Sequence, residues 1–203
     1  MPRYNNRRRA ASPVISVLSL FTIALALLLT GCSKGAGGNS VHVKSAATGE
    51  KDFAVKSSYA FVVTKTFTDI NGKMSTASAY YTYAANYDLD AGNFAMTLDK
   101  PLTSDDQVRV VFSLIGEEGT NDKSPLKAGT YSAKSDKFMK VESVGIVSRK
   151  GGPDTKFWFD RSTLTGAVKL TSASADEIAG DIDVTAGENS VKGSFRAKVL
   201  KRK

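Results

Sequence analysis

The chain has 203 residues and a formal net charge of +8, with 28 Lys and Arg against 20 Asp and Glu. Hydrophobic residues make up 41% and charged residues 24% of the sequence, which excludes a disordered chain and a polytopic membrane protein. A single Cys excludes an internal disulfide framework and a Cys-rich zinc site, and a single His excludes a multi-His metal centre.

The first 31 residues have the layout of an export signal. Four arginines within the first nine residues precede an apolar run from Val14 to Leu29, and small residues follow it. This run of about 16 residues is short of the roughly 20 that span a hydrocarbon core as a helix, whereas a basic start and a short apolar stretch are typical of a cleaved signal. We therefore expect residues 1–31 to be removed, together with four of the 28 basic side chains.

The segment Leu29-Thr30-Gly31-Cys32 resembles the lipobox of bacterial lipoproteins, in which a small residue precedes the cysteine that receives the lipid. The resemblance covers only the first 32 residues. It implies diacylglyceryl transfer to the Cys32 thiol, cleavage before Cys32, and a place in the bacterial cell envelope. Because Ser33 rather than Asp follows the cysteine, the same resemblance implies the outer membrane.

The rest of the chain predicts a short tether and one all-β domain. Residues 32–40 are rich in Gly and Ser and are expected to be flexible. From residue 41 to residue 203, short β-branched and aromatic runs alternate with Gly, Asn and Asp, and no helical period is found. We expect a single antiparallel β-sandwich, with a β-barrel as the alternative, because a count of nine to eleven strands fits both.

Strand alternation gives the clearest local predictions. Asn71-Gly72 predicts the turn of a hairpin between strands near residues 57–67 and 76–84, and residues 108–115 are apolar on both faces, as in a central strand. Residues 116–129 predict a long loop, and residues 151–154 a tighter turn. In a sandwich, Phe61, Phe112 and Phe195 would fill the gap between the sheets.

The last two predicted strands form a hairpin whose register follows from pattern and charge together. That register places Val184 opposite Val191, Ile182 opposite Gly193 and Gly180 opposite Phe195, so that each glycine faces a bulky partner. It also sets two acidic side chains against two lysines on the outer face, namely Asp183 against Lys192 and Glu177 against Lys198.

The sequence lacks the residues of an enzyme. His42 is the only His, no G-x-S-x-G motif is present, and we expect no catalytic site and no cofactor. A hydrolase is the least favoured class. Nucleic acid is a poor partner for an exported chain whose remaining basic residues number 24 against 20 acidic ones.

Trp158 is the most interesting candidate for a contact with a partner or ligand. Alternation groups Phe157 with Phe159 and puts Trp158 on the other face with Lys156 and Asp160. Polar neighbours predict a half-exposed indole that could stack on a sugar or dock an envelope protein. Alternatively, Trp158 simply covers a sheet edge or loop.

Asp88, Asp90 and Asn93 are a weak candidate for a calcium site. Oxygen ligands alternate there and Gly92 permits a sharp turn, but the bidentate Glu of a calcium loop is absent and a hairpin turn explains the same residues. The sequence as a whole therefore favours a lipid-anchored, non-enzymatic binding or assembly module, with a β-barrel carrier of an apolar ligand as the alternative.

Overall fold

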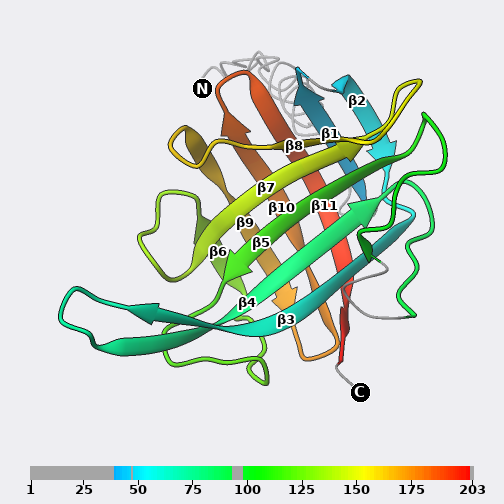
Figure 1. Ribbon diagram of the computed structural model, residues 1–203. Helices are drawn as coiled ribbons and strands as arrows, with labels where there is room; N and C mark the ends of the chain where they lie inside the picture. Colours follow the sequence, from blue (N-terminus) through cyan, green and yellow to red (C-terminus); the bar gives the residue numbers. More distant parts are fainter. Residues whose placement is uncertain (1–38, 47, 93–97, 202–203) are drawn as a thin grey trace, which may run out of the picture. The chain divides into compact units, whose positions relative to one another are not determined.

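The computed structural model describes residues 39–46, 48–92 and 98–201, and its strands belong to one eleven-stranded sheet (Figure 1). The signal segment and Cys32 lie outside these residues, as does all of the tether except Asn39 and Ser40. The strands are β1 (Ser40–Ser45), β2 (Gly49–Ala54), β3 (Ser57–Thr68), β4 (Met74–Ala85), β5 (Val108–Ile115), β6 (Gly129–Ser132), β7 (Lys140–Ser148), β8 (Thr155–Trp158), β9 (Leu164–Ala173), β10 (Glu177–Ala186) and β11 (Asn189–Leu200).

The sheet closes into a barrel of eight strands. The order β10-β9-β6-β7-β5-β4-β3-β11 returns to its start because β10 also pairs with β11. The β1–β2 hairpin is added along β11, and β8 is added along β7. The expected all-β class is therefore confirmed, the sandwich is wrong, and the barrel alternative is right.

Two seams of the barrel are short and parallel. β11 meets β3 through three residue pairs, from Lys198 opposite Tyr59 to Leu200 opposite Phe61. β6 meets β7 through the single pair of Ser132 and Lys140. The remaining pairings of the ring are antiparallel and longer, as the predicted hairpins require. Neither of these two seams is a hairpin, and the β11–β3 seam joins strands far apart in the sequence.

Side chains fill the middle of the barrel. Phe112 of β5 and Phe195 of β11 meet edge to face across the interior, with ring centroids 4.9 Å apart. Phe61 does not join them, because the inward positions of β3 are taken by Ala60 and Val62. Phe61 instead stacks on Tyr81, at 5.1 Å between centroids, in an aromatic cluster outside that core. Two of the three predicted core phenylalanines are correct.

The local predictions agree well with the structure. All eight residues of β5 are buried, which confirms a strand covered on both faces. The β10–β11 register is the predicted one, and Asp183 pairs with Lys192 at 3.2 Å. Glu177 lies opposite Lys198 but forms its ion pair with Arg196. Asn71-Gly72 lies in the turn between β3 and β4, which spans residues 69–73.

The glycines of this hairpin are explained by a third strand rather than by their bulky partners. A Cβ on Gly193, where φ is +143°, would collide with the carbonyl oxygen of Ser40 in β1. A Cβ on Gly180 would collide with the carbonyl oxygen of Lys169 in β9, next to a register shift. Glycine at these positions lets neighbouring backbones approach where the sheet bends into a barrel.

A buried arginine fastens the β4–β5 connection to the barrel wall. Arg109 of β5 is 1% exposed and points outward. Its guanidinium donates to the Tyr87 hydroxyl and the Lys100 carbonyl, each at 3.0 Å, and to the Asp99 carboxylate at 2.9 Å. Leu89 and Leu98 of this connection pack beside Tyr83 and Val111 on the same face. Hydrogen bonds to a desolvated charge are the strong kind, so this contact holds the connection in place.

Candidate functional site

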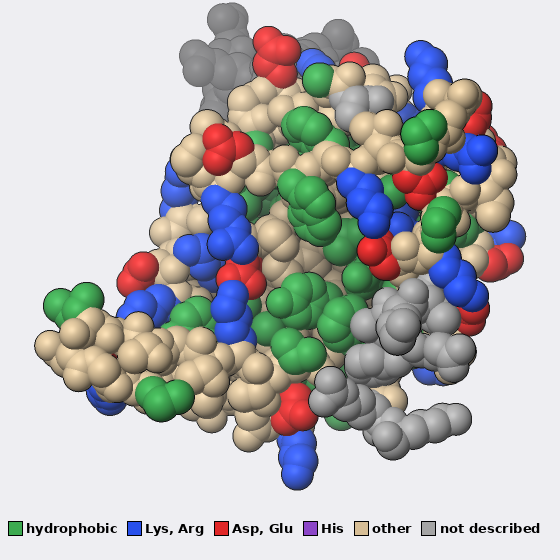
Figure 2. Space-filling view, in the orientation of Figure 1, with side chains coloured by type: hydrophobic (Ala, Val, Ile, Leu, Met, Phe, Trp, Pro, Cys, Tyr) green, Lys and Arg blue, Asp and Glu red, His purple; other side chains and the backbone are tan. Residues whose placement is uncertain are grey.

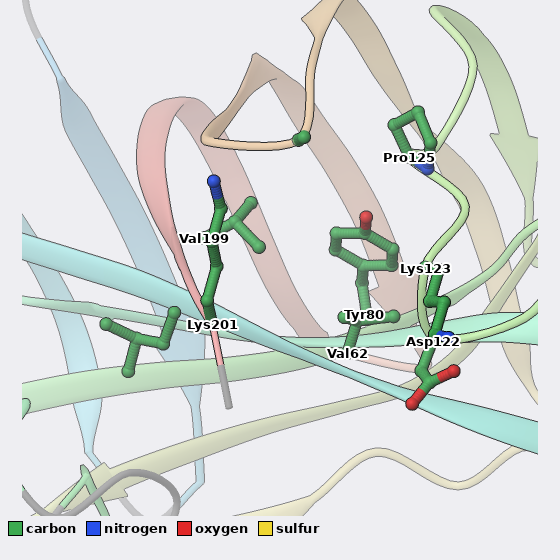
Figure 3. Close-up of a pocket in the computed structure, with 9 residues that line it drawn as sticks. Val62, Tyr80, Asp122, Lys123, Pro125, Val199 and Lys201 are labelled. Carbon is green, nitrogen blue, oxygen red and sulfur yellow. The ribbon is translucent and has the colours of Figure 1, made fainter. Parts of the chain in front are cut away.

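A cavity of about 300 Å³ lies at one end of the barrel (Figure 3). It is bounded by the inner face of the β3–β4 hairpin, by the loop between β5 and β6, by the β9–β10 turn and by the end of β11. The lining residues are Val62, Tyr80, Asp122, Lys123, Pro125, Ala175, Val199, Leu200 and Lys201. The hollow is partly enclosed and its lining is more apolar than polar, which makes it the default candidate for a ligand site.

One wall of the cavity is the long loop predicted at residues 116–129. Thr64 donates its hydroxyl hydrogen to the Asp122 carboxylate at 3.2 Å and accepts the Asp122 N–H at 2.9 Å. The Gly119 N–H donates to the Thr76 carbonyl at 2.8 Å. Leu126 is buried in the main core. These contacts hold the loop against the hairpin and keep the cavity open beside β11.

The floor of the cavity is apolar, with one satisfied hydroxyl. Val62 and Tyr80 are a cross-strand pair of β3 and β4, and Val199 approaches them from β11. The Tyr80 hydroxyl donates to the Ser124 carbonyl at 3.2 Å. Burial raises the pKa of Tyr80 above its ordinary value, so the phenol is neutral near neutral pH. The floor offers contact area rather than a base or a nucleophile.

Charged side chains stand at the rim. Lys201 forms an ion pair with Asp176 at 2.6 Å, and the hydrogen bond from Lys201 holds the pKa of the Asp176 carboxyl below its usual range. Asp122 is engaged by Thr64. Lys123 makes no ion pair within the described part of the chain. An apolar floor with a charged rim fits an amphipathic molecule whose polar end faces water.

Trp158, Lys156 and Asp160 are all exposed, and each has a contact within the chain. Trp158 is 53% exposed and lies over Gly145 of β7, where a Cβ would come within 2.7 Å of the indole. Lys156 reaches the Asp99 carboxylate at 3.1 Å. Asp160 accepts the backbone N–H of Ser162, which lowers the pKa of its carboxyl. Phe157 and Phe159 do contact each other, at 5.9 Å between ring centroids. A contact of the predicted trio with a partner or ligand stays a prediction.

The calcium candidates have lysine partners. Asp88 pairs with Lys56 at 2.8 Å, and Asp90 pairs with Lys100 at 2.6 Å and accepts the Gly92 N–H. Asn93 lies outside the described residues. Over residues 39–46, 48–92 and 98–201, no three His, Cys, Asp or Glu side chains gather in a way that could hold a metal ion. The calcium site stays a prediction without support from the two carboxylates.

His42 lies in a row of ionisable side chains across four strands. Its Nδ1 is 2.9 Å from the Asp52 carboxylate of β2, and its Nε2 is 3.4 Å from that of Glu50. On the other side, Lys192 of β11 lies opposite it and is bonded in turn to Asp183 of β10. No serine or cysteine hydroxyl or thiol is bonded to this imidazole in the described structure, so the row reads as cross-strand charge pairing.

The sequence did not single out the cavity residues. Val62, Tyr80 and Val199 are ordinary inward positions of strands, and the loop was recognised only by its length and polarity. Among the residues that the structure describes, no helix has the length and apolar character needed to cross a membrane. Comparison with protein-family models, with curated proteins and with solved structures gives no match for this chain.

Proposed function

We propose that the barrel is a non-enzymatic carrier that holds a small amphipathic molecule in the cavity between the β3–β4 hairpin and the end of β11. The observation that carries the proposal is the cavity of about 300 Å³ itself, which joins an apolar floor to a charged rim. Its volume is at the lower end of the range for ligand pockets, so a short acyl chain or a single aromatic system fits better than a full lipid.

The filled interior supports the same ligand size. Phe112 and Phe195 occupy the middle of the barrel. A bound molecule is therefore confined to the end where Val62 and Tyr80 form the floor of the cavity. A rim that carries Lys123 and Lys201 favours a ligand with an acidic head group. Asp122 and Asp176 lie beside these lysines and limit this preference to a modest one.

The lipobox resemblance supports a location of this carrier in the cell envelope. In this proposal Cys32 bears the lipid anchor, and the barrel binds its ligand at the surface of the outer membrane without chemical change. Acyl labelling tests this part: Cys32→Ser should abolish incorporation of a labelled fatty acid, and labelling that persists in the variant would refute the anchor.

Ligand binding is tested with anilinonaphthalene sulfonate, a fluorescent aromatic anion. We expect saturable binding with a Kd on the order of 10 μM, which is usual for a ligand of this size. Val62→Phe fills the floor and should abolish binding. Val63→Phe is the matched control, because Val63 lies on the opposite face of the same strand and packs against the cluster of Ala77, Ala79 and Ile115. Equal binding by both folded variants would place the dye elsewhere and contradict the carrier.

A second candidate function rests on Trp158. A half-exposed indole lying flat on Gly145 offers a rigid aromatic surface for a glycan or an envelope protein, which is the binding or assembly module expected from the sequence. Trp158→Ala should leave the fold intact and weaken capture of such a partner from an envelope extract. Unchanged capture would remove Trp158 from consideration.

A further inference from the structure

The β3–β4 hairpin carries two exposed apolar side chains at its tip. Ile70 is fully exposed and Met74 is 68% exposed, and with Trp158 they are the exposed large hydrophobic residues of the described chain. Figure 2 shows hydrophobic side chains at the projecting end of this hairpin, set apart from the body of the barrel. Burying apolar groups of this size is favourable, so their exposure needs a reason.

Side-chain contacts hold the hairpin against the barrel up to Phe67, and the turn beyond it is largely exposed. Lys65 pairs with the mostly buried Glu142 of β7, and Phe67 meets Phe138 edge to face at 5.4 Å. From Thr64, at the rim of the cavity, β3 runs four residues further to Thr68, a distance of about 13 Å. The tip is therefore held out from the barrel by fixed contacts.

The tip carries one acidic and one basic side chain. The Asp69 carboxylate accepts the backbone N–H groups of Asn71 and Lys73, both at 2.9 Å, which fixes the turn. Lys73 makes no ion pair among the residues the structure describes, and it stands between Ile70 and Met74 in the sequence. Its long aliphatic stem lets the ammonium group reach the lipid headgroups while the neighbouring apolar side chains enter the bilayer, which favours a lipid surface.

The tip and the cavity lie at the same end of the barrel. Thr64, in the strand that leads to the tip, is bonded to Asp122 of the cavity wall, and Thr76, in the strand that leaves it, is bonded to Gly119 of the same loop. A bilayer that receives Ile70 and Met74 therefore faces the cavity rim. We propose that the β3–β4 tip inserts into a lipid bilayer and holds the open end of the barrel against it, independently of any anchor at Cys32.

A tryptophan placed at the tip tests this contact in the full chain. In a Trp158→Phe background, Ile70→Trp puts the only indole at position 70. With vesicles of phosphatidylethanolamine and phosphatidylglycerol in excess, we expect its emission to shift to shorter wavelength and to be quenched several-fold by lipids brominated on their acyl chains. The parent protein, whose indole is Trp158 on the barrel wall, should show neither effect.

Two further outcomes decide the matter. Adding Met74→Asp to the tip reporter should remove the quenching, because a carboxylate resists transfer into the bilayer. An indole at position 70 that stays unshifted and unquenched on vesicle-bound protein would overturn the proposal. So would a shift without vesicles that grows with protein concentration, since the tip would then be meeting a second copy of the chain.

Discussion

Trp158 lies flat against Gly145, so close that a Cβ on Gly145 would come within 2.7 Å of the indole. Glycine in the middle of β7 is unfavourable for the strand by itself, by roughly 0.5–1 kcal/mol relative to Ala. The aromatic ring over the bare backbone offsets that cost by covering the ladder beneath it. Substitutions at Gly145 and Trp158 should therefore affect stability in a coupled way.

A double-mutant cycle should reveal this coupling. Gly145→Ala alone is expected to displace the indole, shift its fluorescence to longer wavelength and destabilise the protein by about 1 kcal/mol. In a Trp158→Ala background the same change should be neutral or stabilising, giving a coupling energy of about 1 kcal/mol or more in urea unfolding. Additive effects would mean that the indole does not rest on Gly145 in solution.

The filled interior predicts an asymmetry between two phenylalanines. Phe112→Ala leaves a hole inside the barrel beside Phe195 and is expected to cost about 3–5 kcal/mol. Phe61→Ala removes a partly exposed ring that stacks outside and is expected to cost about 1–2 kcal/mol. Chemical denaturation of the two variants compares them directly. Equal losses would favour the sandwich with both rings in one core.

The ion pair of Arg109 and Asp99 predicts that substitution of each residue lowers stability by a different amount. Asp99→Ala leaves a guanidinium that is 1% exposed without its carboxylate, at a cost of about 2–3 kcal/mol. Arg109→Met leaves Asp99 half-exposed and still bonded to Lys156, and it removes the hydrogen bonds to Tyr87 and Lys100, so a smaller loss of about 1–2 kcal/mol is expected. Thermal unfolding at low and high salt measures both. A larger loss for Arg109→Met would show that packing, not desolvation of the charge, dominates here.

Alkaline stability should depend on Tyr131. Burial raises its pKa to about 12, and its hydroxyl donates to the Lys127 carbonyl. Because the folded state keeps the proton that the unfolded chain releases near pH 10, this contribution is complete below pH 10 and is lost as the pH rises from about 10 to 12. The loss amounts to about 3 kcal/mol.

Urea unfolding between pH 9 and 12 measures this decline. Tyr131→Phe should lower stability at pH 8 by the lost hydrogen bond, about 1 kcal/mol. It should also make the decline above pH 10 visibly shallower. The other buried tyrosines with raised pKa values, Tyr80, Tyr83 and Tyr87, would keep part of the slope. An unchanged slope would mean that Tyr131 is not protected from ionisation.

Features that depend on residues close together in the chain, such as hairpin registers, could be predicted from the sequence. The β10–β11 register was predictable because Val184, Val191 and two charge pairs agree on one alignment. The barrel was not, because β3 and β11 meet through only three pairs that lie about 140 residues apart. The strand glycines did carry a signal for it: Gly180 and Gly193 mark bends that a flat sandwich does not need.

The cavity was beyond prediction for the same reason. Its wall depends on the bond between Thr64 and Asp122, two unremarkable polar residues 58 positions apart. The exposed tip was within reach, since Ile70 stands beside a turn that Asn71-Gly72 already predicted. What could not be read was how far the hairpin extends past the barrel, because Phe67 and Lys65 find their partners in distant segments.

β11 makes closure of this barrel a late event in chain order. β11 pairs with β10, with β1 and with β3, so it follows in sequence every strand that it joins. Until its residues are free, those three strands each keep an open edge, and non-local pairing of this kind is slow. A chain emerging N-terminus first from a ribosome or an export channel therefore stays unclosed until β11 has emerged. Late closure keeps the chain able to pass through a channel for longer, and a chain cut before Lys198 would lack the β11–β3 seam and stay open to aggregation and proteolysis.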